Sequence, residues 1–218
     1  MKNFLALFSR TPLFLGAAEA DLERILSCLQ AQETQYLKKE RILSPGTVSR
    51  RFGIVLSGSV RICREDSSGN GMLLAQLFPG DLFAEAFACA GQPLTVAAEA
   101  AEAVRILWID SRKMLAFCGK ACPAHALAAE NLLQILAQKN IFLTDRIQHL
   151  SCRSLREKVW SFLSEQAVLA KNSSFAIPFN RQQMADYLAA DRSALSAVLC
   201  RMQEEGLLRF HKNRFTLL

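Results

Sequence analysis

Short apolar runs separated by glycine-containing turns fill the chain between about residues 36 and 110. Ile54, Leu56, Val60 and Ile62 fall at alternate positions on either side of a turn at 57–59, the spacing of strands with one buried face. Residues 67–71 have the composition of a hairpin loop. Because such turns recur at short intervals, the pattern predicts a small antiparallel barrel or double-sheet roll, preceded by amphipathic helices.

Between residues 121 and 149 the pattern changes to that of one continuous helix, with no glycine and no proline after Pro123. A helix of about seven turns with an apolar stripe needs a partner for that stripe. We expect a second copy of the chain to supply it across a two-fold axis. The expected seam consists of Leu132, Ile135, Leu136, Lys139, Phe142, Leu143 and Ile147. The alternative is a helix that lies on its own β-domain.

After a hinge at residues 150–154, the apolar spacing predicts a helical unit that ends in a hairpin. A loop at 171–174 leads to two short helices within Phe179–Met202. Asn180 and Asp191 stand where the N-caps of these helices are expected, and Gln183 completes a capping box with Asn180. Two alternating stretches around residues 211–214 then predict a β-wing.

The second of these short helices, from Arg192 to Met202, has two unlike faces. Its apolar face is Leu195, Val198, Leu199 and Met202, and its small or cationic face is Arg192, Ser193, Ser196, Cys200 and Arg201. Such a helix suits the major groove of DNA, where Arg grips guanine and Ser reaches base edges or phosphate. We expect Arg181 and Gln182 beside the phosphate backbone, and Lys212 and Arg214 near the tip of the wing. The alternative is a winged helix that docks on another protein without binding DNA.

Charge and cysteine usage agree with a two-domain cytoplasmic protein. Residues 151–218 carry ten Lys/Arg against six Asp/Glu, so this third of the chain holds +4 of the total net charge of +6. The seven cysteines form no CxxC pair, so neither a zinc site nor a disulfide framework is indicated. No stretch is long and apolar enough to cross a membrane, and the first 20 residues read as helix, not as a targeting segment.

Three stretches resemble the Crp/Fnr family of bacterial transcription regulators: Gly53–Ile62, Leu77–Ala86 and Arg181–Leu208. The resemblance implies an α+β fold. Residues 1–120 would form an antiparallel β-roll of the jelly-roll, cyclic-nucleotide-binding-like type with flanking helices. Residues 121–150 would form the dimerisation helix and hinge, and residues 151–218 a winged helix-turn-helix.

The resemblance also implies roles for residues of the DNA reader. Arg181 matches a phosphate-contacting position, and Arg192 matches the base-reading Arg of the family. Ser193 stands where many members have Glu, and Ala197 where many have a second Arg, so the half-site is expected to differ from that of the cyclic-AMP member. With these, the predicted DNA-binding set is Arg181, Gln182, Asp191, Arg192, Ser193, Ser196, Ala197, Arg201, Lys212 and Arg214.

The effector site departs from the pattern of the cyclic-nucleotide binders, which have Gly-Glu followed by Arg-Ser. Here the matching pairs are Ala84-Glu85 and Leu94-Thr95, and no Arg or Lys lies between Asp81 and Val104. Burying a phosphate without a cation or amides costs several kcal/mol, so cyclic AMP is not expected. The remaining expectation is a pocket for a small organic or aromatic molecule, made of Phe83, Ala84, Glu85, Phe87, Leu94, Thr95 and Phe142. The alternative is a pocket that holds no ligand.

Other sensing chemistries find less support in the sequence. An iron–sulfur sensor would need a cysteine cluster near the amino terminus, where Cys28 stands alone, and none of the three His residues is expected to be a haem ligand. Cys118 and Cys122 are spaced by one helical turn and are the redox alternative. No catalytic constellation, phosphate loop or metal spacing appears, so we expect no enzyme. The predicted function is a homodimeric regulator of a palindromic DNA operator, with RNA polymerase as a further partner implied by the family.

Overall fold

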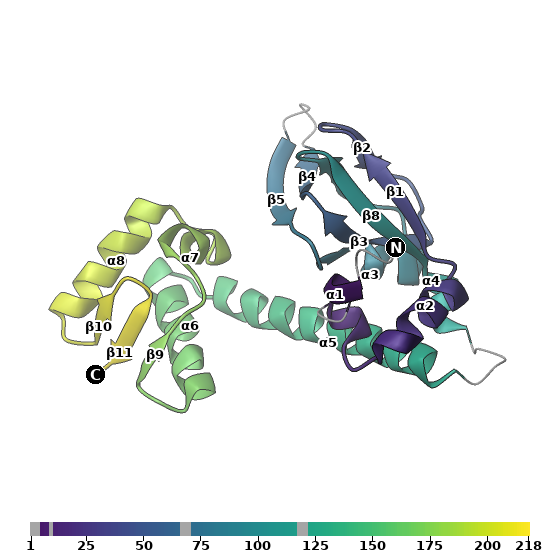
Figure 1. Ribbon diagram of the computed structural model, residues 1–218. Helices are drawn as coiled ribbons and strands as arrows, with labels where there is room; N and C mark the ends of the chain where they lie inside the picture. Colours follow the sequence, from purple (N-terminus) through teal and green to yellow (C-terminus); the bar gives the residue numbers. More distant parts are fainter. Residues whose placement is uncertain (1–4, 9–10, 66–70, 117–121) are drawn as a thin grey trace. The chain divides into compact units, whose positions relative to one another are not determined.

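The computed structural model describes residues 5–8, 11–65, 71–116 and 122–218 (Figure 1). The chain divides into two compact units, Met1–Ala137 and Gln138–Leu218. The long helix α5, Pro123–Leu150, contributes to both units, because the division falls inside it. The structure confirms the single long helix that we expected between residues 121 and 149. Its first part belongs to the first unit and its second part to the second unit.

The first unit is built on two four-stranded antiparallel sheets, which confirms the expected β-roll. One sheet has the order β1 (Gln32–Tyr36), β8 (Val104–Asp110), β3 (Arg51–Ser57) and β6 (Leu82–Phe83). The other has the order β2 (Arg41–Leu43), β7 (Ala97–Ala100), β4 (Val60–Glu65) and β5 (Gly71–Leu77). The helices of this unit are α1 (Leu5–Phe8), the 3-10 turn η2 (Pro12–Phe14), α2 (Glu19–Cys28), α3 (Glu85–Ala90) and α4 (Ser111–Leu115).

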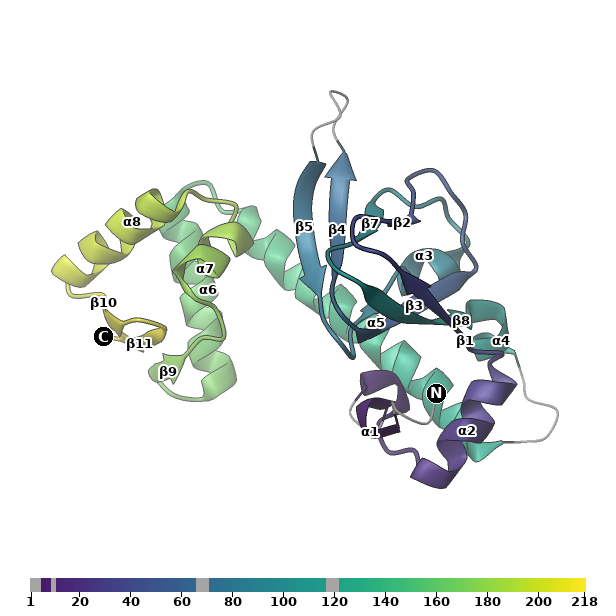
Figure 2. The same cartoon turned by 45° about the horizontal axis from the view of Figure 1, so that its top comes forward.

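Two apolar clusters hold the first unit together, and strands β3 and β8 contribute to both. Between the sheets, Val55, Phe83, Ile106 and Trp108 fill the interior of the roll with residues of both sheets. On the other side of β3 and β8, residues such as Phe52 and Leu107 pack with α2 and the first half of α5. Figure 2 shows the ribbons of these strands and helices. Strand β3 is therefore buried over five consecutive residues, 52–56, and does not show the one-faced alternation that we expected.

A tight turn at residues 58–59 joins β3 to β4, as predicted. Gly58 has a φ of +77°, and a Cβ there would lie 2.3 Å from the carbonyl oxygen of Ala103. Glycine is required at this position both for its conformation and for the close approach of backbone. Of the second predicted hairpin loop, residues 67–70 lie outside the described residues; the strands β4 and β5 that flank it pair antiparallel.

The second unit combines helices with a small sheet. It contains the end of α5, α6 (Leu155–Ala170), β9 (Ser174–Ala176), α7 (Arg181–Tyr187), α8 (Arg192–Glu204), β10 (Leu208–His211) and β11 (Arg214–Leu217). The sheet order β10-β11-β9 adds one strand to the predicted wing, because Phe175 pairs with Phe215. The winged helix-turn-helix expected from the sequence is confirmed.

The helix starts of this unit follow from local sequence. Ser154 accepts a hydrogen bond from the amide of Glu157, whose carboxylate accepts from the amide of Ser154 in return. Asn180 and Gln183 form the same reciprocal box at the start of α7. Such boxes satisfy amides that have no partner within the helix, and they fix where each helix begins.

Of the α5 residues that we expected at a dimer seam, some are buried in the first unit and others are exposed. Leu132 is 1% exposed and belongs to the core of its own unit, and Ile135 and Leu136 pack against that core. The first half of α5 therefore rests on its own β-domain, as in the alternative considered for it. The exposed large apolar side chains of α5 are Leu133 in this first half and Ile141, Phe142, Leu143 and Ile147 further along.

Candidate nucleic-acid interface

Helix α8 presents one anchored and one exposed face. Leu195, Leu199 and Met202 are at most 1% exposed and pack into the core of the second unit. Arg192, Ser193, Ala197, Cys200 and Arg201 are exposed, and Ser196 is half-buried. The residues that we expected to face DNA thus lie together on one surface of a helix whose opposite surface is fixed.

The start of α8 is held by Asp191. Its carboxylate accepts hydrogen bonds from the amides of Ser193 (2.8 Å) and Ala194 (3.1 Å), and also from the Ser193 hydroxyl. These bonds, led by the one from the Ser193 hydroxyl, lower the pKa of Asp191. The Ser193 hydroxyl is thereby committed as a donor, and it is left with acceptor capacity toward a ligand.

Two of the residues predicted to contact DNA, Arg181 and Gln182, interact with other residues of the protein. The Arg181 guanidinium lies over the rings of Phe210 (5.0 Å) and Phe215 (5.8 Å) and donates to the carbonyl of Lys212 at 3.3 Å. Burial there lowers its pKa. Arg181 therefore ties α7 to the wing, whereas we expected only a phosphate contact. The Gln182 side-chain amide donates to Asp186 at 2.9 Å and remains exposed.

The wing places further cations at the surface. Lys212 and Arg214, both predicted, are exposed at the turn between β10 and β11. Arg209, which we did not predict, is exposed on β10. The strand alternation contained the signal for it, because the neighbours Leu208 and Phe210 point inward.

The residues expected to line an effector pocket are mostly packed in the first unit. Phe83 is 4% exposed and lies edge-on to Trp108 at 5.5 Å, so it is part of the roll's core. Leu94 is buried, Glu85 is buried, Phe87 is half-buried and Thr95 is exposed. Phe142 belongs to the second unit, where its ring lies 5.6 Å from that of Tyr187.

Two features near α3 bear on which ligand the roll can hold. Ala84 has a φ of +62°, a left-handed conformation that favours glycine. Arg50 lies across Gly91, since a Cβ on that glycine would be 2.2 Å from its guanidinium. Sequence inspection of residues 81–104 missed this cation because Arg50 comes from the segment before β3.

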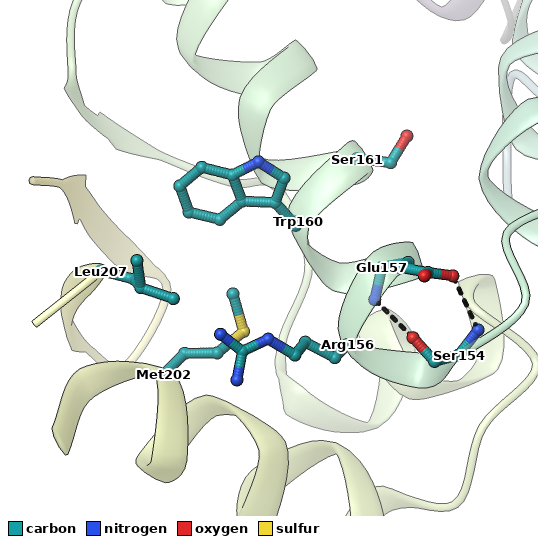
Figure 3. A pocket seen from close by; sticks show the side chains of 7 residues that line it. All are labelled: Ser154, Arg156, Glu157, Trp160, Ser161, Met202 and Leu207. Carbon is teal, nitrogen blue, oxygen red and sulfur yellow. Dashed lines mark hydrogen bonds between the residues drawn. The ribbon is translucent and has the colours of Figure 1, made fainter. Parts of the chain in front are cut away.

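A hollow of about 420 Å³ lies in the second unit between α6 and the end of α8 (Figure 3). Trp160, Met202 and Leu207 provide its apolar walls, and its remaining lining residues are Ser154, Arg156, Glu157 and Ser161. Arg156 is paired with Glu205 at 2.5 Å. None of the predicted DNA-binding residues lines this hollow.

Two of the cysteines line one hollow of the first unit. Cys122 is 8% exposed, and together with Cys28 it lines a separate hollow of about 380 Å³ in the first unit. Cys118, the partner proposed for Cys122, lies outside the described residues. Within the described ranges, no group of three His, Cys, Asp or Glu is arranged to hold a metal ion. No helix in these ranges combines the length and the apolar character needed to span a bilayer.

Comparison with known proteins gives the class of each unit. Residues 33–121 match the model of the cyclic nucleotide-binding domain, and residues 157–218 match that of the Crp-like helix-turn-helix domain. These are domains of transcription regulators, not of enzymes. The chain belongs to the Crp/Fnr family of bacterial transcription regulators, which confirms the family that its motifs indicated.

Individual relatives extend over most of the chain. It is 27% identical over 199 residues to the cyclic AMP receptor protein of Thermus thermophilus, covering 91% of this chain and 88% of that protein. It is 25% identical over 193 residues to the nitrogen fixation regulation protein FixK of Azorhizobium caulinodans, covering 84% and 73%. The crystal structure of the Thermus thermophilus catabolite activator protein has a similar fold, with a TM-score of 0.52 and 23% identity over 95% of this chain and 93% of that one.

Proposed function

We propose that this protein is a homodimeric, sequence-specific DNA-binding regulator that inserts α8 into the major groove of each half of a palindromic operator. The observation that carries the proposal is the division of α8 into a face fixed by Leu195 and Leu199 and a face that exposes Arg192, Ser193 and Arg201. A reading helix needs this division, because its base contacts require a rigid support.

In this proposal Arg192 reads a base edge from the first turn of α8, and guanine is the base whose two acceptors fit a guanidinium. Ser193, Ser196, Ala197 and Arg201 contribute further contacts along the same face. Asp191 sets the start of the helix and makes no base contact. Gln182, Lys212 and Arg214 hold phosphates on either side, and Arg181 supports the wing.

Two copies of the chain are proposed to join along α5. Ile141, Leu143 and Ile147 are 60%, 53% and 65% exposed, a density of large apolar side chains that monomers rarely leave uncovered. A second copy is the partner we propose, because a palindromic operator is read across a two-fold axis. Ile147→Asp is then expected to give a monomer in sedimentation velocity. Val168→Asp, at a site on α6 that is 74% exposed, is expected to leave the dimer intact.

The signal is proposed to be a small apolar molecule or a redox change, not a cyclic nucleotide. Ala84 occupies a position whose left-handed backbone favours glycine, so its methyl group stands where cyclic-nucleotide binders have none. Arg50 lies across Gly91, within the 84–95 segment, and comes from the residues before β3. Isothermal titration with cyclic AMP is expected to give no heat of binding at millimolar ligand.

The test of DNA binding uses fluorescence anisotropy with operator fragments selected from a random pool. Wild-type affinity is expected to fall steeply with salt, as phosphate contacts release counterions. Arg192→Ala should weaken binding by roughly 5- to 150-fold, the value of one bidentate base contact. Arg24→Ala, a matched control on α2 of the first unit, should have no effect. Retention of a protein partner without any salt-sensitive DNA binding would instead favour a protein-interaction module.

A further inference from the structure

We infer that Arg146, near the end of α5, is a positioning residue of the DNA reader: it caps the carboxyl end of α7 and makes the last turns of α5 part of the helix-turn-helix unit. The inference rests on the proposed DNA-binding function and adds the element that orients the reading helix. It concerns contacts within the second unit only.

Arg146 contacts α7 at the carbonyl groups of its last two residues. Its Nε donates to the carbonyl oxygen of Tyr187 at 3.0 Å, and its Nη2 donates to that of Asp186 at 2.9 Å. The guanidinium also lies 5.5 Å from the centre of the Tyr187 ring. Among the described residues no backbone amide donates to the Tyr187 carbonyl. A cation with a rigid fork of donors is well matched to the negative end of a helix.

The contact of Arg146 is one of three along the same face of α5. One turn earlier, Phe142 lies 5.6 Å from Tyr187, ring to ring. One turn later, His149 is 2% exposed, and its ring nitrogens lie 3.0 Å from the Ser161 hydroxyl and 2.8 Å from the Glu165 carboxylate on α6. Positions 142, 146 and 149 share one helix face. Three successive turns of α5 are thus fastened to α6 and α7 (Figure 1).

These contacts change which part of the chain can flex. The turn at 151–154 lies between α5 and α6, and we expected the hinge there. His149 bridges that turn through Ser161 and Glu165, and the compact second unit begins at Gln138. Bending between the sensing and reading units is therefore expected before Phe142, within the helix itself.

The position of α7 is transmitted directly to α8. The turn after α7 begins at Leu188, which is fully buried with Leu195 and Leu199 of α8, and the amide of Ala190 donates to the carbonyl of Ala185 at 2.9 Å. This turn ends at Asp191, the N-cap of α8. Releasing the carboxyl end of α7 is therefore expected to loosen the first turn of α8, where Arg192 and Ser193 lie.

The experiment compares Arg146→Ala and Arg146→Lys with Arg153→Ala. Arg153 is a suitable control because it is exposed nearby and its guanidinium has no hydrogen bond or ion pair among the described residues. Operator affinity, its salt dependence, the dimer mass and the hydrogen exchange of residues 186–195 are measured for each. Arg146→Ala should weaken operator binding by about tenfold or more and speed exchange at 188–194, with the dimer mass unchanged. Arg146→Lys keeps the charge but lacks the forked pair of donors. Its operator affinity and exchange rates should lie between those of Arg146→Ala and those of the Arg153→Ala control.

The salt dependence separates positioning from a direct phosphate contact. A positioning role leaves the slope of affinity against salt unchanged, whereas loss of a phosphate contact lowers it by about one. A lowered slope, or wild-type exchange and affinity in Arg146→Ala, would overturn the inference. If wild-type protein bound no DNA, the proposed function would fail, and the exchange rates of the two Arg146 variants would still decide whether the cap exists.

Discussion

Truncating Leu199 to alanine is expected to destabilise the second unit selectively. Leu199 is 0% exposed at the centre of the second unit's core. Leu→Ala changes at such sites cost about 2.7–5 kcal/mol, because the lost transfer energy and the cavity add. A unit of this length has a stability of about 4–12 kcal/mol. The substitution is therefore expected to remove between about a fifth and all of that stability, and to lower the melting temperature by about 10 °C or more.

The two tryptophans of the chain allow each unit to be followed separately. Trp108 lies in the roll and Trp160 on α6 of the second unit. Thermal unfolding followed by fluorescence in a Trp108→Phe background reports the second unit, and a Trp160→Phe background reports the first. Leu199→Ala should shift the Trp160 transition and leave the Trp108 transition in place.

Val168→Ala is the matched control, since Val168 lies on α6 of the same unit but is 74% exposed. Its effect should stay within about 0.5 kcal/mol. Equal shifts for Leu199→Ala and Val168→Ala would refute the assignment of Leu199 to the core. Equal shifts of both tryptophan transitions in Leu199→Ala would refute the independence of the two units.

Two further predictions concern the packing of the roll and the loss of stability at low pH. Gly53→Ala would place a Cβ 2.4 Å from the Phe83 ring, and overpacking of this kind should cost the first unit about 1–3 kcal/mol, seen in the Trp108 transition alone. Hydrogen bonds from the Ser154 amide and, at Asp191, from the Ser193 hydroxyl lower the pKa values of Glu157 and Asp191 below their ordinary 4.5 and 3.8. Because both pKa values are lower in the folded protein, the two carboxylates stabilise the fold at any pH above their unfolded-state pKa values. This stabilisation is lost as the pH falls through their folded-state pKa values. Glu157→Gln with Asp191→Asn should therefore flatten the loss of Trp160-reported stability below about pH 5.

The starts of α7 and α8 could be predicted from local sequence, because a helix start depends on residues within one turn of each other. Asn180 with Gln183 and Asp191 were identifiable as caps without any tertiary information, and the structure has all three bonded as such. The face of α8 was likewise fixed by spacing, since one buried side suffices to define an amphipathic helix.

Strands covered on both faces were harder to interpret. Val55 and Leu56 are both buried on β3, one toward the roll interior and the other toward the helices. An apolar run of this kind has no alternation to reveal which face meets which partner. Strand β9 was missed for a different reason: its three residues become a strand only through pairing with β11.

The sequence by itself determined the family, the order of the elements, the helix caps and the two faces of α8, because each depends on neighbours along the chain. Only the tertiary structure decided that Leu132 is a core residue, that Arg181 rests on the wing and that Arg146 caps α7. Those roles depend on which surfaces meet across 30 or more residues of chain. A leucine can pack at a dimer seam or in a core, and an arginine can bind a phosphate or a helix end. Which of these roles it has depends on its position in the fold.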